Sequence, residues 1–446
     1  MKFLAPIIKS TLLATAACGA LAASMGAGAA ANEQFIPLAI YRTGPMATSG
    51  IPIWSGFIDY MDMTNKRDGG INGVKLVWEE CETEYKTDRG IECYERLKKK
   101  GPTGATTFMP GSTAISYAVL ERAAADKIPM INVGYGRTDA SDGRVFPYVF
   151  PLLGNYLSGS TTKIKFMGLR EGGMDKLKGK KIVNLYHGSA FGKETIPILD
   201  IQGRKYGFEI THIEVPHPGN DQQSQWLQIR QIKPDWVILR GFGIMNSVAL
   251  KTAQKVGYPA DRIVGTWQAA AEEDVLPAGD AAKGYIAAGL QMSGSNFPVI
   301  QEIAQVLYSG GKKGNLNDPK RIGTHFYNYG VVFGILHVEA IRTAQEKFGK
   351  KPLTGEQTQW GLEHLNIDDK RLKQIGALGF IPNIKTSCLD HEGGGSVKFK
   401  QWDGQKWITI TDWIKGDPSL VRPLIEESAA KYAKEKNITP RDCSKE

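Results

Sequence analysis

Four short segments of the sequence combine glycine with residues that can hold a small polar molecule. They are Gly111-Ser112-Thr113, Gly134-Tyr135-Gly136, His187-Gly188-Ser189 and Gly241-Phe242-Gly243. Glycine lets backbone N–H groups come close to a ligand, and a serine or threonine at a helix start can cap the helix and also face a ligand. Aromatic residues in equivalent places can form a pocket wall: Tyr135, Phe191, Phe242 and Trp267. This combination indicates binding chemistry.

Patterns that would indicate catalysis or a cofactor are missing from the sequence. There is no G-x-S-x-G, H-E-x-x-H or Walker A motif, and no cysteine or histidine spacing typical of zinc. Residues 241–246 narrowly miss the dinucleotide fingerprint, and no acid follows roughly twenty residues later. Glu272 and Glu273 are typical of charges at a helix start rather than of an acid–base pair. We therefore expect no cofactor, no metal and no enzymatic activity.

The elements that must position these segments alternate between strand and helix. Strands are expected at 35–41, 74–80, 105–109 and 129–133, with helices at 53–65, 89–100 and 114–126. The pattern restarts with strands at 181–186, 209–215, 236–239 and 263–265 and helices at 193–206, 222–232 and 247–256. This order predicts an α/β protein with two consecutive doubly wound parallel sheets. In such sheets ligands bind beyond the carboxyl ends of the strands, where the glycine-containing segments lie.

The remainder of the chain changes character. Helices are expected at 297–308, 327–348 and 356–365. Residues 393–410 alternate between apolar and polar, and Asp403-Gly404 is a hairpin turn signal. The tail from Pro418 to Glu446 is charged, and we expect it to wrap a surface.

The first 31 residues have the pattern of a cleaved signal peptide. Lys2 and Lys9 precede a short apolar stretch, which small residues follow. Cys18 loosely resembles a lipoprotein attachment site, but Thr15 stands where such sites usually carry leucine, so we favour cleavage over lipidation. No later stretch is long and apolar enough to span a bilayer. These features predict an exported, periplasmic protein whose mature form does not span the membrane.

The charge and the cysteines are consistent with export. The formal charge is +9, but the basic residues are dispersed, so nucleic acid is not an expected partner. We also expect the protein to be a monomer. Beyond Cys18, four cysteines remain, and an even number in an exported protein favours disulfides. Four cysteines allow three pairings. The local one joins Cys81 to Cys93 and Cys388 to Cys443.

The order and spacing of several motifs resemble a known family, the periplasmic solute-binding proteins of branched-chain (hydrophobic) amino acid ABC transporters. The motifs are Thr43-Gly44-Pro45, Gly69-Gly70-Ile71-Asn72-Gly73, Met109-Pro110-Gly111-Ser112-Thr113, Ile131-Asn132-Val133-Gly134 and Val264-Gly265-Thr266-Trp267. The resemblance implies the type I fold, in which two Rossmann-like lobes joined by three crossings close like a clamp. It places one lobe at 32–153 plus 291–378 and the other at 154–290 plus 379–446, with hinges near Leu153, Leu290 and Leu378.

The resemblance also implies how a ligand is held. In relatives, loops matching Ser112, Thr113, Gly134 and Gly136 bind the ligand carboxylate. The second lobe contributes aromatic residues matching Phe191 and Phe242, and an acid that pairs with the ligand ammonium. Trp267 stands at the position of that acid. Because a buried ammonium without a partner is costly, this substitution favours an aromatic or apolar carboxylate.

Two alternatives remain open. If the alignment shifts, Glu272, Glu273 or Asp274 could supply the acid, and the ligand would then be a branched-chain amino acid. The same clamp also occurs in ligand-sensing receptors. As a transport protein, the chain would deliver its ligand to an inner-membrane ABC permease.

Overall fold

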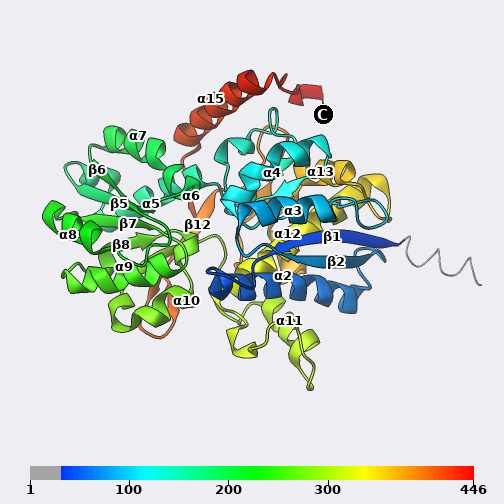
Figure 1. Ribbon diagram of the computed structural model, residues 1–446, viewed down its shortest axis with the longest axis horizontal. Coiled ribbons are helices and arrows are strands. Elements are labelled where there is room, and N and C mark those ends of the chain that lie inside the picture. The colour runs from blue at the N-terminus through cyan, green and yellow to red at the C-terminus, as the bar shows by residue number, and fades with distance from the viewer. Residues whose placement is uncertain (1–31, 446) are drawn as a thin grey trace, which may run out of the picture.

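The computed structural model describes residues 32–445, and the expected signal peptide, with Cys18, lies outside them. The chain forms two α/β lobes that lie side by side, with the C-terminal helix across the top of both (Figure 1). The first lobe contains the strands β1 to β4, and the second contains β5 to β9. The expected fold class is confirmed.

The sheet of the first lobe is parallel. Strand β1 (Glu33–Ile40) pairs with β2 (Lys75–Glu82), and β3 (Met130–Ile131) pairs with β4 (Val149–Phe150). Single bridges from Leu38 to Met109 and from Phe108 to Met130 join these pairs. The segment expected as a strand at 105–109 contributes only these bridges, and Pro110, which has no N–H group to donate, follows directly.

Helices cover the first lobe on both faces. They are α2 (Ala47–Asp68), α3 (Thr87–Leu97), α4 (Thr113–Ala125), α11 (Pro298–Tyr308), α12 (His325–Phe348), α13 (Gly355–Glu363) and α14 (Asp369–Gln374). The helices α2 and α12 pack so closely that the backbone of one contacts the backbone of the other. A Cβ atom on Gly56 would lie 2.2 Å from the carbonyl oxygen of Tyr327, and one on Gly330 would lie 1.8 Å from that of Ile53. Glycine is therefore required at both positions.

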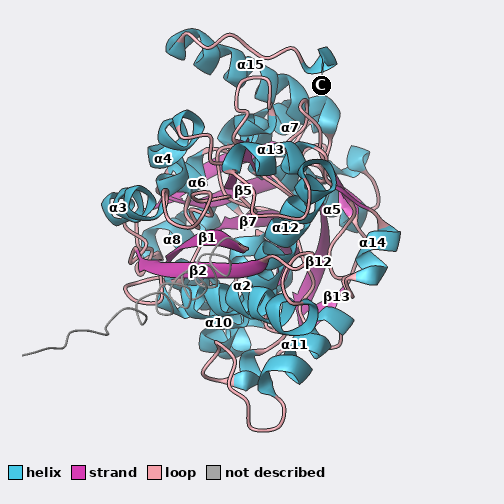
Figure 2. Ribbon diagram, turned by 90° about the vertical axis from the view of Figure 1, so that its right-hand side faces the viewer, coloured by secondary structure: helices cyan, strands magenta, loops and turns pink. Residues whose placement is uncertain are grey.

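The second lobe is built on a larger sheet, of which Figure 2 labels the strands β5, β7, β12 and β13. Its parallel strands stand in the order β6 (Glu209–Val215), β5 (Lys181–His187), β7 (Trp236–Arg240), β8 (Ile263–Gly265) and β9 (Ile286–Gly289). Its helices are α5 (Tyr156–Glu171), α6 (Ala190–Lys193), α7 (Ile196–Tyr206), α8 (Gln223–Ile232), α9 (Ile244–Lys255) and α10 (Glu272–Val275). Strand β12 (Ser396–Trp402) adds to β9 antiparallel, and β13 (Trp407–Thr409) completes the expected hairpin.

The chain passes between the lobes after β4, after β9 and before β12. Before the last passage, β11 (Ile384–Lys385) pairs with β10 (Asn366–Ile367) of the first lobe. Glu392 lies at this passage, and its carboxylate accepts hydrogen bonds from the Asn155 N–H (2.9 Å) and the Ser158 hydroxyl (3.0 Å). Hydrogen bonds therefore connect the passage before β12 to the passage after β4.

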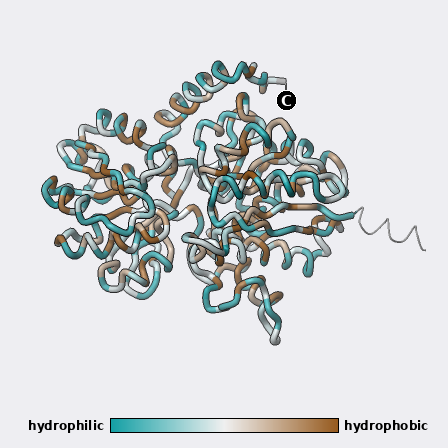
Figure 3. The backbone as a smooth tube through the Cα atoms, in the orientation of Figure 1, coloured by the Kyte–Doolittle hydropathy of each residue, from teal (hydrophilic) through white to brown (hydrophobic). Residues whose placement is uncertain are grey.

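The charged tail forms the helix α15 (Pro418–Lys436), on which hydrophobic and hydrophilic residues alternate (Figure 3). Val421 and Ile425 pack against Leu157 and Ile198 of the second lobe. Toward its end, Tyr432 stacks on Phe146 of the first lobe, with ring centroids 4.8 Å apart. The helix therefore contacts both lobes.

Both predicted disulfides are present. Cys81 is bonded to Cys93 and Cys388 to Cys443, with Cα–Cα distances of 5.6 and 5.7 Å. The second bond ties the segment after α15 to the loop after β11. Arg441 reinforces this attachment through an ion pair with the buried Glu363.

Replacing both cysteines of a pair by serine should lower the free energy of unfolding, and by more for the longer loop, because the entropy of loop closure grows with the logarithm of loop length. Chain entropy predicts a loss of about 4 kcal/mol for Cys388 and Cys443, which are 55 residues apart, and of about 3 kcal/mol for Cys81 and Cys93, which are 12 apart. Urea unfolding of the two double variants measures the difference. A larger loss for the shorter loop would contradict this ranking.

Glu392 should make the stability depend on pH, because burial raises its pKa from 4.5 to about 7. The native state binds this proton more tightly than the unfolded chain does. The contribution of Glu392 to the free energy of unfolding therefore falls as pH rises from 4.5 to 7, by about 3 kcal/mol. Glu392→Gln should gain about that much relative to wild type between pH 4 and pH 8, by urea unfolding. The exposed Glu435→Gln is the control, and equal pH profiles for Glu392→Gln and wild type would refute the assignment.

Candidate functional site

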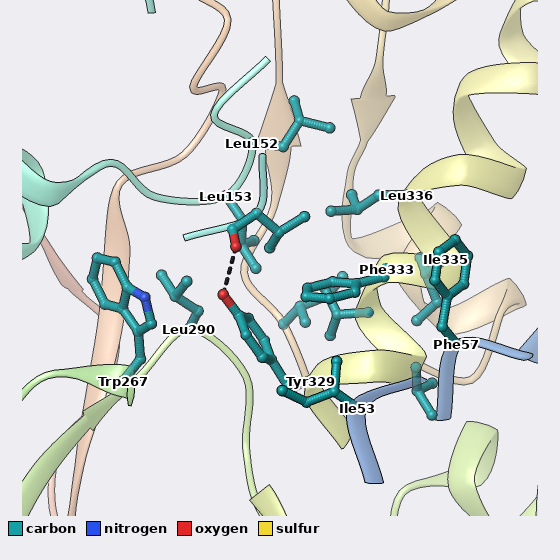
Figure 4. Close-up of a cluster of buried hydrophobic side chains, with 14 of the residues drawn as sticks. Ile53, Phe57, Leu152, Leu153, Trp267, Leu290, Tyr329, Phe333, Ile335 and Leu336 are labelled. Atoms are coloured by element: carbon teal, nitrogen blue, oxygen red, sulfur yellow. Dashed lines mark hydrogen bonds between the residues drawn. The ribbon is translucent and has the colours of Figure 1, made fainter. Parts of the chain in front are cut away.

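The loops that follow β3 and β8 meet between the lobes. The carbonyl oxygen of Gly134 accepts one hydrogen bond from the indole N–H of Trp267 (3.1 Å) and another from the side-chain amide of Gln268 (2.6 Å). Gly134 has φ +62°, which glycine adopts without strain. A Cβ there would lie 2.5 Å from the Tyr329 hydroxyl and 2.6 Å from the Trp267 ring nitrogen. Figure 4 shows the Leu290 side chain between those of Trp267 and Tyr329.

A second contact joins α4 of the first lobe to α5 and α6 of the second. The Thr113 hydroxyl bonds the Tyr156 hydroxyl (2.8 Å) and accepts from the Gly136 N–H (3.3 Å). Glu194, which follows α6, accepts from the Thr138 N–H (2.6 Å) and the Tyr117 hydroxyl (3.0 Å). Burial raises the pKa of Glu194. Both of its oxygens are therefore engaged by the first lobe.

Aromatic side chains line the meeting place. The Tyr135 hydroxyl lies 3.2 Å from that of Tyr41, and the Phe242 ring lies 5.6 Å from the Tyr85 ring across the lobe boundary. Tyr85 has φ +63°, a strained conformation that is common at binding loops. Trp267 stacks on Tyr156 with centroids 6.0 Å apart. These rings come from both lobes.

A buried arginine completes the cluster. Arg240 ends β7, is 1% exposed, and donates from Nε to the Phe191 carbonyl (2.8 Å). Its guanidinium carbon lies 4.2 Å from the Tyr156 ring centroid and 4.4 Å from that of Phe191. Burial lowers the pKa of Arg240 to about 10, so the side chain is charged at neutral pH. The sequence reasoning missed this residue, although it immediately precedes Gly241-Phe242-Gly243 at a strand end.

A buried polar chain holds the backbone of Trp267. His325 donates from Nε2 to the Trp267 carbonyl (2.8 Å), which leaves Nδ1 to accept from Lys400 (3.0 Å). Lys400 also donates to the Ser293 hydroxyl (2.6 Å). Burial lowers the pKa of Lys400 to about 7. The position of Trp267 thus depends on strand β12.

The three acids after Trp267 are engaged by the protein. Glu272 accepts from the His325 N–H (2.8 Å), and Glu273 forms an ion pair with Arg321. Asp274 accepts from Asn246 (3.0 Å) and from the Ala271 N–H (3.1 Å). Burial raises the pKa of Asp274 to about 8. These contacts hold α10 against its neighbours.

The structure therefore brings most of the expected site residues together. Thr113, Gly134, Gly136, Phe191 and Trp267 lie in the contacts described above, and Tyr135 and Phe242 belong to the adjoining aromatic cluster. Ser112 is buried at the N-cap of α4, where its side chain makes no capping bond. The Trp267 indole, 2% exposed, is used in contacts between the lobes.

A cavity of about 500 Å³ adjoins Tyr117 and Glu194 on the side of α15. In residues 32–445, no group of three or more His, Cys, Asp or Glu side chains is placed to hold a metal ion. Within the same range, no helix has both the length and the apolar character needed to cross a membrane.

Comparison with known proteins gives a consistent picture. The family model described as periplasmic binding protein matches residues 33–406. A crystal structure described as an ABC transporter permease from the Pseudomonas fluorescens group is 52% identical, with a TM-score of 0.89, and the match covers 92% of this chain and 99% of that one. No curated protein matches the sequence.

More distant structures share the fold. One is a branched-chain amino acid ABC transporter protein from Thermus thermophilus with bound valine (20% identity, TM-score 0.71, covering 88% of this chain and 98% of that one). Another is a solute-binding protein of an ABC transporter from R. palustris in complex with benzoate (18% identity, TM-score 0.64, covering 85% and 95%).

Gly134→Ala should destabilise the protein more than backbone strain alone explains. Gly69 has a similar φ of +70° but open space around it, so Gly69→Ala should cost only about 1 kcal/mol. Gly134→Ala adds the collision with Tyr329 and Trp267 and should cost about 2–3 kcal/mol. Urea unfolding compares the two, and equal losses would show that the contact at Gly134 is not tight.

Proposed function

The chain belongs to the periplasmic binding proteins, and from that premise we propose that it is the extracytoplasmic substrate-binding component of an ABC importer. It captures a small molecule between its lobes and delivers it to an inner-membrane permease. The observation that carries this proposal is the meeting of strand-end loops from both lobes around Gly134, Trp267 and Tyr156. A site divided in this way can open and close with its ligand.

The ligand we propose is a small carboxylate with an aromatic or apolar body. The rings of Tyr135, Phe191, Phe242 and Trp267 supply apolar surface with defined orientation. Glu272 and Asp274 are bound to protein groups, and Glu273 is paired with Arg321 and keeps one buried oxygen without a partner among the described residues. We take this engagement to disfavour a ligand ammonium at that place. A branched-chain amino acid in the same transport role is the alternative ligand.

The role is binding without turnover, in the periplasm, after export by the signal peptide. The sequence of residues 1–31 supports the export step. The two disulfides suit an oxidising compartment. A ligand-sensing receptor with the same clamp would bind the same molecule without handing it to a permease.

Calorimetry with leucine, benzoate-type acids and their amides tests the ligand class. An aromatic acid should bind wild type, and Trp267→Ala should weaken its binding by roughly 2- to 10-fold through loss of stacking. Trp267→Phe retains a ring and should keep most of the affinity. Thermal melting of both variants without ligand separates folding defects from binding defects.

Tight leucine binding that survives Trp267→Ala would overturn the aromatic-acid assignment. Conversion of any bound compound during prolonged incubation would overturn the non-enzymatic role.

A further inference from the structure

A charged and incompletely bonded guanidinium is buried where the lobes meet. Arg240 donates from Nε to the Phe191 carbonyl, but its terminal nitrogens, Nη1 and Nη2, are buried without a hydrogen-bond partner among the described residues. A buried charge without its hydrogen bonds costs several kcal/mol. Burying Arg240 at this position therefore lowers the stability of the folded protein rather than raising it.

The surroundings of Arg240 include ionisable groups of both signs, but none of them hydrogen-bonds its terminal nitrogens within the described residues. Lys163, on the same helix α5 as Tyr156, is also buried and donates to the Gly159 carbonyl (2.8 Å). Burial and the charge of Arg240 lower the pKa of Lys163. The carboxylate of Glu194 acts on Arg240 through its charge, but its own hydrogen bonds go to Thr138 and Tyr117.

The first-lobe groups that the family resemblance assigns to a ligand carboxylate are partly engaged with each other. The Gly136 N–H donates to the Thr113 hydroxyl, which also bonds the Tyr156 hydroxyl of the second lobe. The Arg240 fork has both terminal nitrogens buried and without a partner among the described residues. Two parallel N–H groups match a carboxylate in geometry.

We infer that Arg240 receives the carboxylate of the ligand, so that the anionic end binds the second lobe at the end of β7. The flat faces of Tyr156 and Phe191, which already contact the guanidinium, then orient the carboxylate end of the ligand. The expected class is a monocarboxylate without a compensating ammonium group. This inference rests on the proposed function and specifies which residue selects the anion.

Arg240→Met tests the inference because methionine keeps the length of the stem and removes the charge. The probes are benzoate, 4-hydroxybenzoate, hexanoate and leucine, each paired with its primary amide, measured by calorimetry and thermal shift on the full chain. Arg240→Met should weaken acid binding roughly 100-fold or more and change amide binding less than about 5-fold. Arg240→Lys keeps the charge but loses the two parallel N–H groups, so its affinity for the acids should lie between those of wild type and Arg240→Met.

Two further variants serve as controls. Arg230→Met removes an exposed arginine from α8 of the same lobe and should bind every probe as wild type does. Thr113→Val removes the first-lobe hydroxyl and should weaken acid binding less than Arg240→Met does. Without ligand, Arg240→Met should melt no lower than wild type, since it removes an unpaired buried charge.

The outcomes separate the inference from the proposed function. If wild type binds acids and Arg240→Met binds them within about 3-fold, or loses acids and amides equally, the assignment to Arg240 is wrong and the transport role stands. If Thr113→Val loses more acid affinity than Arg240→Met, the carboxylate lies on the first lobe. If wild type binds amides but none of the acids, both the inference and the proposed ligand class fail.

Discussion

Two parallel sheets present the carboxyl ends of their strands to one boundary, and the rest of the molecule depends on that constraint. Parallel strands joined by helices all end at the same edge, so the loops with free N–H groups and exposed side chains gather there. In this protein the loops after β3 and β8 touch directly, at the carbonyl of Gly134. The close fit requires a glycine with positive φ, and three side chains occupy the space that a Cβ would need.

The electrostatics of this boundary differ from what an amino acid binder needs. The position that the resemblance gives to an acid holds Trp267, whose indole N–H is used to join the lobes. The nearby acids Glu272 and Asp274 support α10 and the His325 backbone. Among the described residues, Arg240 carries a buried positive charge whose two terminal nitrogens have no hydrogen-bond partner, and Glu273 keeps one buried oxygen without a partner beside its ion pair with Arg321. The unpaired guanidinium of Arg240 is the basis for proposing an anionic ligand rather than a zwitterion.

The C-terminal segment ties the two lobes from outside. The helix α15 lies beyond the residues matched by the family model, which end at 406. It packs on Leu157 in the second lobe and on Phe146 in the first, and the disulfide at Cys443 fastens the chain end to the loop that carries Cys388. Motion of the lobes must therefore either move this helix as a unit with one lobe or slide it over the other.

Local pattern predicted most of the strands and helices, the hairpin at Asp403-Gly404 and the local disulfide pairing, but it missed the helices α5 and α15 and overstated the strand at 105–109. Hydrophobic periodicity reports which face of an element is buried, and turn residues report where it ends.

Periodicity does not report which element lies against that face. Trp267 and Gly134 are 133 residues apart, and the Arg240 Nε bonds a carbonyl 49 residues away. In the sequence, Arg240 directly follows the strand predicted at 236–239 and was not singled out. Only the tertiary structure decided that its guanidinium is buried against Tyr156 and Phe191 with two nitrogens unbonded, because burial of a side chain depends on elements that the chain brings from elsewhere.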